Sequence, residues 1–336
     1  MDATSVVGWG VIGPGHIASG FADAMEMVDG GEIVAVASRA MARADAYGDR
    51  YGVATRYGDY AALAEDPRVD VVYVATPQSR HADDTITMLR AGKHVLCEKP
   101  FALNAGQAQQ MVDEARGRRL FLMEAIWSRF LPAYRVLVDA ISSGRIGEPR
   151  LVEADFGFRR PPDPDDRLFR ADLGGGGLLD LGIYPLQLCT LLLGPVEDAA
   201  AEGVIGETGV DEAVAAVLRH GQGRLGVIKA ALRMNMACDA RVSGTEGVIE
   251  IPALMHCPNA LRIVSPAGVD DVDASYEGNG LRFEIDEVHR CLADGRTESE
   301  VMPLAETLAL AGTLDDIRHQ IGLVFPGEEP LRTRVY

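Results

Sequence analysis

The sequence predicts an α/β protein in two parts: a doubly wound parallel sheet at the N-terminus, then an α+β domain with a mostly antiparallel open sheet. In the first half, apolar strands alternate with segments of helical periodicity, a pattern typical of parallel β–α–β units. In the second half, strand-like segments follow one another without helices between them, which favours antiparallel pairing. A chain of 336 residues is long enough for both domains.

Composition narrows the classes of partner. The chain is 47% hydrophobic and 24% charged, with a formal net charge of −18. That charge argues against nucleic-acid and anionic-membrane partners, which require basic surfaces. No apolar run approaches the roughly 20 residues of a membrane span, and no secretion signal is visible. Cysteines are scattered without metal-ligand spacing, so we expect reduced thiols, a cytoplasmic protein and no metal; they are Cys97, Cys189, Cys238, Cys257 and Cys291.

The stretch Val6–Ala18 predicts a dinucleotide site. An apolar strand leads directly into G-x-G-x-x-A, and a segment with helical spacing follows. In this context Gly13 permits the tight turn, Gly15 allows close approach to a pyrophosphate, and Ala18 lets the helix pack closely on the strand. The helix N-terminus supplies free N–H groups. We therefore predict a Rossmann-type domain; the alternative is a glycine-rich turn without a ligand.

The end of the second strand, Glu32–Ser38, indicates which dinucleotide is bound. NAD enzymes usually have an acidic residue at this end for the ribose 2′-hydroxyl. Here the strand ends in Ser38 and Arg39, with Arg43 four residues later. These side chains suit a 2′-phosphate, so NADP(H) is favoured over NAD(H). The alternative is that both arginines are solvated surface residues.

Two later strands carry further polar residues to the same edge of the sheet. The strand Val69–Ala75 ends in Thr76-Pro77, and Lys93–Cys97 ends in Glu98-Lys99. Ligands of open α/β sheets bind at the carboxyl ends of the strands. The strand Leu120–Met123 completes this domain, so we expect residues 1–124 to bind the dinucleotide and residues 125–336 to form the second domain.

The second domain is expected to contain an amphipathic helix after the glycine run Gly174–Gly177, and then a succession of strands. We expect the glycines to let the backbone approach the cofactor. Pro185 should kink or loosen the helix, because it cannot donate to the carbonyl four residues earlier. Expected strands are Pro149–Phe156, Val196–Val204, Asp211–Arg219, Arg224–Leu232, Ala240–Ser243, Val248–Ile251 and Leu261–Val264.

Asp180 and Tyr184 are four residues apart, so both should lie on one face of this helix. A neighbouring ammonium lowers the pKa of a tyrosine, which then can exchange a proton near neutral pH. Lys99 is the obvious source of that charge, since the chain has few lysines. The alternative is an ordinary helix surface. Because Lys99 and Tyr184 belong to different expected domains, we expect the substrate to bind between them.

Several segments resemble the glucose–fructose oxidoreductase / inositol dehydrogenase (Gfo/Idh/MocA) family over essentially the whole chain. The segments are Gly13–Ala18, Ala75–Pro77 with His81, Ala91–Pro100 and Gly175–Gly182. Inositol dehydrogenases have a histidine where this chain has Tyr184. That departure resembles the branch of NADP-dependent D-xylose 1-dehydrogenases and dimeric trans-dihydrodiol dehydrogenases, as do Leu120–Phe130, Leu179–Tyr184, Glu207–Asp211 and the pair Arg39 and Arg43.

The resemblance implies a hydride transfer between NADP and a hydroxyl of a sugar or cyclic diol, in a homodimer or higher homo-oligomer formed through the open sheet face. It implies Tyr184 as acid/base, Lys99 as its assistant and Asp180 in positioning substrate or Lys99. His81 could contact substrate or could face solvent. Expected cofactor residues are Gly13, Gly15, His16, Ile17, Ser38, Arg39, Arg43, Thr76, Pro77, Glu98, Lys99, Trp127, Arg129 and Arg170; expected substrate residues are His81, Lys99, Trp127, Asp180 and Tyr184.

Two other functions stay open at this point. A keto-sugar reductase or an inositol-type dehydrogenase would use the same residues, because the chemistry is reversible. A non-catalytic sensor that binds sugar and dinucleotide is the alternative from a different class. The presence of both Lys99 and Tyr184 favours an enzyme.

Overall fold

The structure is a computed structural model that describes residues 6–328. Residue contacts divide the chain into two units. Unit 1 contains the chain up to Phe130 together with Glu277–Leu308, and unit 2 contains Leu131–Tyr276 and the chain from Ala309 on. The expected domains, 1–124 and 125–336, differ from these units chiefly in the segment Glu277–Leu308, which packs with the N-terminal part.

Unit 1 is built on a six-stranded sheet with the order β3-β2-β1-β4-β5-β6, in which all neighbours are parallel. The strands are β1 (Val7–Ile12), β2 (Gly31–Ala37), β3 (Thr55–Tyr57), β4 (Val71–Val74), β5 (His94–Glu98) and β6 (Leu122–Ala125). Every residue of β1, β4 and β6 is buried, as expected for parallel strands covered on both faces. The predicted doubly wound sheet is confirmed.

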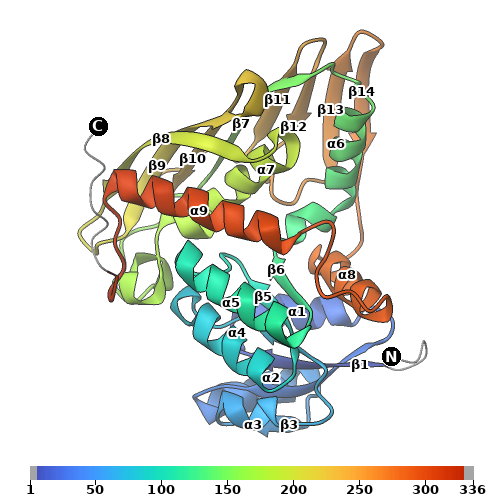
Figure 1. Cartoon of the computed structure of the whole chain (residues 1–336), viewed down its shortest axis with the longest axis vertical. Coiled ribbons are helices and arrows are strands. Elements are labelled where there is room, and N and C mark those ends of the chain that lie inside the picture. Colours follow the sequence, from blue (N-terminus) through green and yellow to red (C-terminus); the bar gives the residue numbers. More distant parts are fainter. Residues whose placement is uncertain (1–5, 329–336) are drawn as a thin grey trace. The chain divides into compact units, whose positions relative to one another are not determined.

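The helices of unit 1 cover this sheet (Figure 1). Among their contacts, α4 packs on β4, β5 and α5, while α1 packs on β2 and α8. The helices are α1 (His16–Met25), α2 (Met41–Tyr51), α3 (Tyr60–Ala64), α4 (His81–Arg90), α5 (Ala105–Arg118) and α8 (Leu281–Ala293); short 3₁₀ turns lie at Gln78–Arg80 and Trp127–Phe130.

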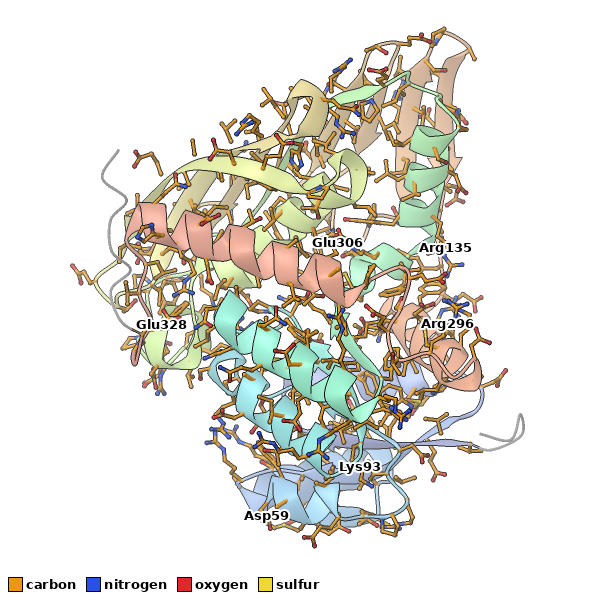
Figure 2. All side chains as sticks on the ribbon, in the orientation of Figure 1. Asp59, Lys93, Arg135, Arg296, Glu306 and Glu328 are labelled. Carbon is orange, nitrogen blue, oxygen red and sulfur yellow. The ribbon has the colours of Figure 1, made fainter. Side chains whose placement is uncertain are left out.

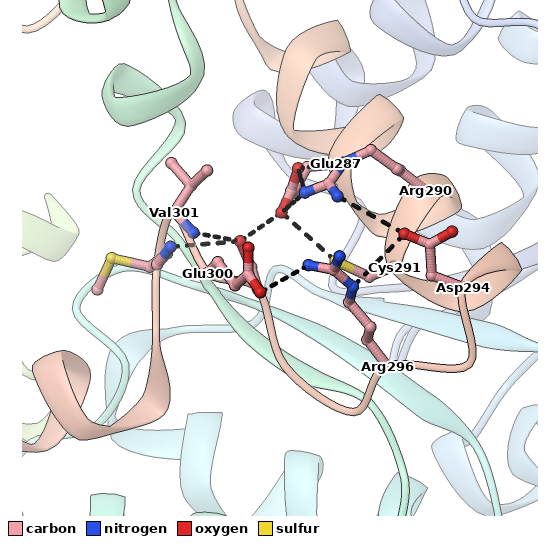
Figure 3. A network of polar contacts seen from close by, with 9 residues as sticks. Glu287, Arg290, Cys291, Asp294, Arg296, Glu300 and Val301 are labelled. Atoms are coloured by element: carbon pink, nitrogen blue, oxygen red, sulfur yellow. Dashed lines mark hydrogen bonds and ion pairs between the residues drawn. The ribbon is translucent and has the colours of Figure 1, made fainter. Parts of the chain in front are cut away.

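A polar network fixes α8 and the segment that follows it (Figure 3). The Glu287 carboxylate accepts hydrogen bonds from Arg290 at 2.6 and 2.7 Å and from the buried Ser299 hydroxyl at 2.5 Å. The Cys291 thiol donates to the same carboxylate at 3.4 Å. Asp294 pairs with Arg290 of α8 at 3.7 Å and with Arg296 at 3.4 Å, and Arg296 pairs with Glu300 at 3.1 Å, so helix and loop form one connected structure. Sequence patterns did not indicate this network, because part of it lies in a polar loop without periodicity after α8.

Unit 2 contains an eight-stranded sheet with the order β14-β13-β12-β11-β7-β10-β9-β8. Only β10 and β7 pair in parallel, so the mostly antiparallel sheet is confirmed. The strands are β7 (Pro149–Gly157), β8 (Val196–Ile205), β9 (Asp211–His220), β10 (Arg224–Ala231), β11 (Ala240–Gly244), β12 (Val248–Ile251), β13 (Ala260–Ser265) and β14 (Gly268–Asp273). Edge strand β14 was not predicted, since most of its residues are exposed and three are aspartates.

The helices of unit 2 include one that is buried on all sides. In α7 every residue except Leu191 is buried, so the expectation of an amphipathic helix was wrong: an apolar helix packed all round is a core helix. The stretch Ala171–Leu193 is long and apolar enough to cross a membrane, but 94% of its most apolar window is buried inside the structure. The elements are α6 (Pro132–Ser142), a π-helical turn (Leu178–Gly182), α7 (Ile183–Leu193), α9 (Leu304–Ile321, which contains the division between the units) and 3₁₀ turns at Arg167–Phe169, Ala171–Leu173 and Gly221–Gly223.

Candidate functional site

The turn between β1 and α1 has the geometry of a pyrophosphate cradle. Gly13 has φ +76°, and a Cβ there would lie 2.6 Å from the carbonyl oxygen of Ala75. Gly15 is the N-cap of α1, and a Cβ there would meet only the Gly13 oxygen at 3.8 Å. The first turn of α1, with exposed His16 and half-buried Ile17, has no acidic residue and no capping side chain. Its N–H groups are therefore available to an anion.

The loop after β4 contributes a polar atom to the same end of the sheet. Thr76 is buried, and its hydroxyl has no hydrogen-bond partner among residues 6–328. Half-buried Pro77 follows it. A buried hydroxyl without a partner is costly, by about 1–3 kcal/mol, unless a ligand or water satisfies it. The glycine cradle and this hydroxyl fit a bound dinucleotide.

The end of β2 presents basic side chains. Ser38 is buried, and its hydroxyl accepts a hydrogen bond from the Ala40 N–H at 3.3 Å. Arg39 and Arg43 are exposed. Neither forms an ion pair with an acidic residue in the described part of the chain. Both guanidinium groups are therefore accessible to an added phosphate.

Glu98, at the end of β5, turns its carboxylate into the protein. It accepts hydrogen bonds from the Tyr73 hydroxyl and from the Lys99 N–H, the latter at 3.2 Å. Burial raises the pKa of Tyr73 well above its usual value, so this phenol remains a donor. The Glu98 side chain is thus engaged with protein groups, and its expected contact with a cofactor stays a prediction.

His81 is buried and joins two loops. Its Nδ1 lies 2.8 Å from the carbonyl oxygen of Pro100, and its Nε2 lies 2.9 Å from that of Thr76. Burial lowers the pKa of His81, while the two carbonyl groups act in the opposite direction. The alternative in which His81 faces solvent was wrong. With both ring nitrogens facing carbonyl groups, this arrangement offers none to a substrate.

Of the three lysines, Lys99 is the one in a strand-end loop. Lys93, labelled in Figure 2, is buried, and its ammonium donates to the carbonyl groups of Asp66 and Val69 at 2.7 and 2.8 Å. Lys229 lies on β10 and pairs with Asp155 at 3.2 Å. Lys99 is half-buried. The first two lysines therefore have structural roles.

Trp127 and Arg129 belong to a 3₁₀ turn after β6, and the structure pairs Arg129 with a residue far along the chain. Its guanidinium is fully buried and donates to both carboxylate oxygens of Glu306, at 2.7 and 2.5 Å. Glu306 lies in the first turn of α9 (Figure 2). Trp127 is half-buried. Arg129 holds the start of α9, a role that the sequence alone did not indicate.

In unit 2, Tyr184 lies in an aromatic cluster at the start of α7. Its ring centroid is 5.7 Å from that of Phe156 and 5.1 Å from that of His256, and the latter two stack at 4.4 Å. Tyr184 is only 5% exposed. Sequence reasoning missed Phe156 and His256, because they lie on β7 and in the loop after β12, far from Tyr184 in the chain.

Asp180, also 5% exposed, lies in the π-helical turn before α7. It accepts hydrogen bonds from Arg167 at 3.1 and 3.4 Å. The π-turn fits the expected effect of Pro185, and such turns are frequent at functional sites. Arg170 pairs instead with Asp172 at 3.0 and 2.5 Å and is half-buried.

Protein atoms fill the space beside the glycine run where side chains would lie, which gives these glycines a structural reason; the expected approach of their backbone to a cofactor stays a prediction. A Cβ at Gly175 would lie 2.5 Å from the carbonyl oxygen of Arg167, and one at Gly176 would collide with the Asp211 carboxylate. Asp211 is fully buried and accepts the Leu178 N–H at 2.6 Å, which satisfies the start of the π-turn. Burial raises the pKa of Asp211 to about 7.

An unpartnered acid, Glu284 on α8, is buried close to Glu98. It is fully buried, and neither carboxyl oxygen has a hydrogen-bond partner in residues 6–328. Burial, together with the charge of Glu98, raises the pKa of Glu284 well above its usual 4.5. Burial therefore favours the protonated, neutral form of Glu284 in the folded protein.

Replacing Glu284 by glutamine should remove a pH dependence of stability. A raised pKa in the folded state means that stability is fully present below about pH 4.5 and falls as the pH rises toward the folded value. Relative to wild type, Glu284→Gln should gain thermal stability progressively above that pH. Melting temperatures across the pH range measure this, with exposed Glu26→Gln as the control for loss of one charge. A constant difference between variant and wild type would contradict it.

No group of three or more metal-ligating side chains occurs within the described residues, and all five cysteines are free thiols.

An open helix N-terminus after a glycine turn, at the strand ends of a parallel sheet, is the arrangement by which enzymes hold a dinucleotide pyrophosphate. The fold and this site define a dinucleotide-dependent oxidoreductase. Family models agree: one described as "Oxidoreductase family, NAD-binding Rossmann fold" matches residues 7–125, and one described as "GFO/IDH/MocA C-terminal domain" matches residues 134–250. The chain belongs to the Gfo/Idh/MocA family.

Known relatives support this assignment along the whole chain. A trans-1,2-dihydrobenzene-1,2-diol dehydrogenase from Mus musculus is 38% identical over 96% of this chain and 98% of its own length. Among solved structures, KijD10, a 3-ketoreductase from Actinomadura kijaniata in complex with NADP and TDP-benzene, has a TM-score of 0.86 and 28% identity, covering 94% of this chain and 98% of its own. An aldose-aldose oxidoreductase from Caulobacter crescentus has a TM-score of 0.85 and 26% identity, covering 94% of this chain and 97% of its own. The protein is an NAD(P)-dependent dehydrogenase acting on hydroxyl groups.

Proposed function

We propose that the protein is an NADP-preferring dehydrogenase whose substrate is a D-xylose-like aldose, oxidised at C1, or a trans-dihydrodiol. The observation that carries the proposal is Tyr184, a buried phenol at the start of α7 with Asp180 one turn earlier. The named relatives act on diols and sugars, which supports this substrate class. A nicotinamide, when bound, supplies the hydride acceptor.

The residues of the chain would handle the proton. During oxidation, the Tyr184 oxygen would take the proton of the substrate hydroxyl as the hydride leaves the same carbon, and it would return that proton during reduction. The ammonium of Lys99 would favour the phenolate form. Asp180, which accepts two hydrogen bonds from Arg167, would orient a substrate hydroxyl. The proposal requires Lys99 and Tyr184 to reach one substrate.

A keto-sugar reductase is the second candidate, favoured by the likeness to a 3-ketoreductase in complex with NADP. The same residues would serve the reverse direction. An inositol-type dehydrogenase is a weaker candidate, because this family branch carries tyrosine at position 184.

Initial rates with NADP⁺ and NAD⁺ against pentoses, hexoses, inositols and aromatic trans-dihydrodiols test the proposal. We expect turnover with pentoses or dihydrodiols and little with inositols. Turnover confined to inositols would contradict the proposed substrate class. Turnover seen only with NADPH and keto-sugars would assign the second candidate.

Cofactor preference should depend on two arginines. Charge-assisted hydrogen bonds contribute about 1.5–3 kcal/mol each, so kcat/KM should favour NADP over NAD at least tenfold, and Arg39→Ala with Arg43→Ala should abolish the preference. Arg50→Ala is the matched control, because Arg50 is exposed and lies on α2, the helix that also carries Arg43. Equal efficiency of the two cofactors with the wild-type protein would contradict the preference.

We also propose a cytoplasmic homodimer that associates through the outer face of the unit 2 sheet. The partly exposed pairs Leu225 with Leu151 and Val227 with Val217 lie opposite one another on neighbouring strands there, which makes an apolar strip. Light scattering of the wild type and of the double variant Leu225→Glu/Val217→Glu tests this proposal. We expect a dimeric wild type and a monomeric variant, and a monomeric wild type at micromolar concentration would contradict the proposal.

A further inference from the structure

The loop after β5 is held by buried side chains from three other elements. Tyr73 on β4 donates to Glu98, and His81 on α4 bonds the Pro100 carbonyl at 2.8 Å. Glu124 on β6 accepts the Phe101 N–H at 3.0 Å. These bonds flank Lys99 in the sequence on both sides.

Strand register explains why the bonds come from both faces of the sheet. Tyr73 pairs with Leu96 on β5, and Glu98 is two residues further on, so Tyr73 and Glu98 point to the same face. Glu124 pairs with Cys97, so both point to the opposite face. The first face is covered by α1, whose Phe21 stacks on Tyr73 with ring centroids 4.0 Å apart. The loop is thus restrained from two directions at once.

We propose that Tyr73 and Glu124 are positioning residues for Lys99: their hydrogen bonds to Glu98 and Phe101 fix the backbone that directs the Lys99 ammonium. The inference rests on the proposed function, in which Lys99 assists the proton transfer. Neither residue touches the reacting atoms. They act only through the loop.

The hydrogen bonds of Tyr73 and Glu124 restrain the loop strongly because both side chains are buried. Tyr73 is fully buried and Glu124 is 2% exposed, so water cannot replace a lost partner. Burial also raises the pKa of Glu124 to about 7, and in either protonation state a carboxyl oxygen remains to accept the Phe101 N–H. Lys99 is half-buried, and the backbone on either side of it sets the point and direction from which its side chain starts.

Chemical labelling of lysines measures how accessible and reactive the Lys99 amine is, and therefore reports its position. The chain has only three lysines, so acylation followed by peptide mass spectrometry reports Lys99, with Lys229 in unit 2, whose surroundings the substitutions do not touch, as the internal reference. In Tyr73→Phe, which keeps the ring stacked on Phe21, we expect the ratio of Lys99 to Lys229 labelling to change at least threefold. We also expect kcat per NADPH-binding site to fall about tenfold, since displacements of about 1 Å can reduce rates by up to 10²-fold. The KM for NADP should stay within twofold.

Matched variants separate positioning from simple loss of stability. Tyr57→Phe removes another tyrosine–carboxylate hydrogen bond, to Asp66 at 3.1 Å, and should leave Lys99 labelling unchanged. Glu124→Met removes the acceptor for Phe101, whereas Glu124→Gln keeps one. Labelling and kcat should be altered in the methionine variant and restored in the glutamine variant. If Tyr73→Phe does not fold, this pair decides the question.

The ratio of Lys99 to Lys229 labelling tests the positioning of Lys99 independently of turnover. A labelling ratio equal to wild type in Tyr73→Phe or Glu124→Met would overturn it. An altered ratio with unchanged kcat would support the positioning of Lys99 and contradict its proposed part in catalysis. An altered ratio with lowered kcat and unchanged KM for NADP supports both.

Discussion

Replacing Tyr184 by phenylalanine is expected to lower turnover by about 10²–10⁴-fold, the range that general acid–base catalysis contributes. The ring would keep its contacts with Phe156 and His256, so the variant loses only the hydroxyl. Because the phenol is 5% exposed, bulk water has little access to take its place. Affinity for NADPH should change little, since the glycine cradle belongs to unit 1.

Steady-state kinetics across pH, with fluorescence titration of NADPH, measure this result. In wild type, the rate of oxidation should show a basic limb below the usual pKa of tyrosine, about 10, and the variant should lack that limb. Tyr134→Phe is the matched control: Tyr134 is also buried in unit 2, where its hydroxyl donates to the Met255 carbonyl at 3.1 Å. Retention of more than about a third of wild-type turnover, far outside the range for an acid/base, would rule out Tyr184 in this role.

The second large effect is expected at Lys99. Lys99→Met should reduce turnover about as much as Tyr184→Phe, because the phenol would lose the charge that makes it ionise near neutral pH. The double variant should lose much less than the product of the two single losses, since residues that act as a unit are not additive. Lys99→Arg should recover only part of the turnover that Lys99→Met loses, because a guanidinium is larger and does not release its proton.

Lys229→Met controls for the loss of a lysine, since that side chain pairs with Asp155 on the sheet of unit 2. The measurement is kcat and kcat/KM for all five variants with one substrate. A double variant whose loss equals the product of the single losses would show that the two residues act separately.

The parts of the fold that depend on local pattern were predictable from the sequence. The apolar strand, glycine turn and helix of Val7–Met25 are one continuous signal, and the structure has them as β1 and α1. The strand ends that carry Thr76 and Lys99 follow from strands buried on both faces. These features need neighbours within only a few residues of the chain.

Features made by distant residues were not predictable. Nothing near Gly176 indicates that Asp211 fills the space beside it, because 35 residues separate them in the sequence. The pairing of Arg129 with Glu306 and the contact of Tyr184 with His256 were not predictable for the same reason: each joins residues that are far apart in the sequence. A buried π-turn also looks like an ordinary helix in sequence, since four of its five residues, LLDLG, are leucine or glycine rather than a distinctive motif.

The return of Glu277–Leu308 to unit 1 has a consequence for synthesis on the ribosome. The indole N–H of Trp9 donates to His289 at 2.9 Å, and the Leu122 N–H donates to the Thr297 carbonyl at 3.1 Å. Neither acceptor exists until residues 131–276 have been translated, a delay of roughly 7–30 s at ~5–20 residues per second. The half of the enzyme that is made first is therefore completed late, and α1 and the 3₁₀ turn Trp127–Phe130 lack their packing against α8 until then.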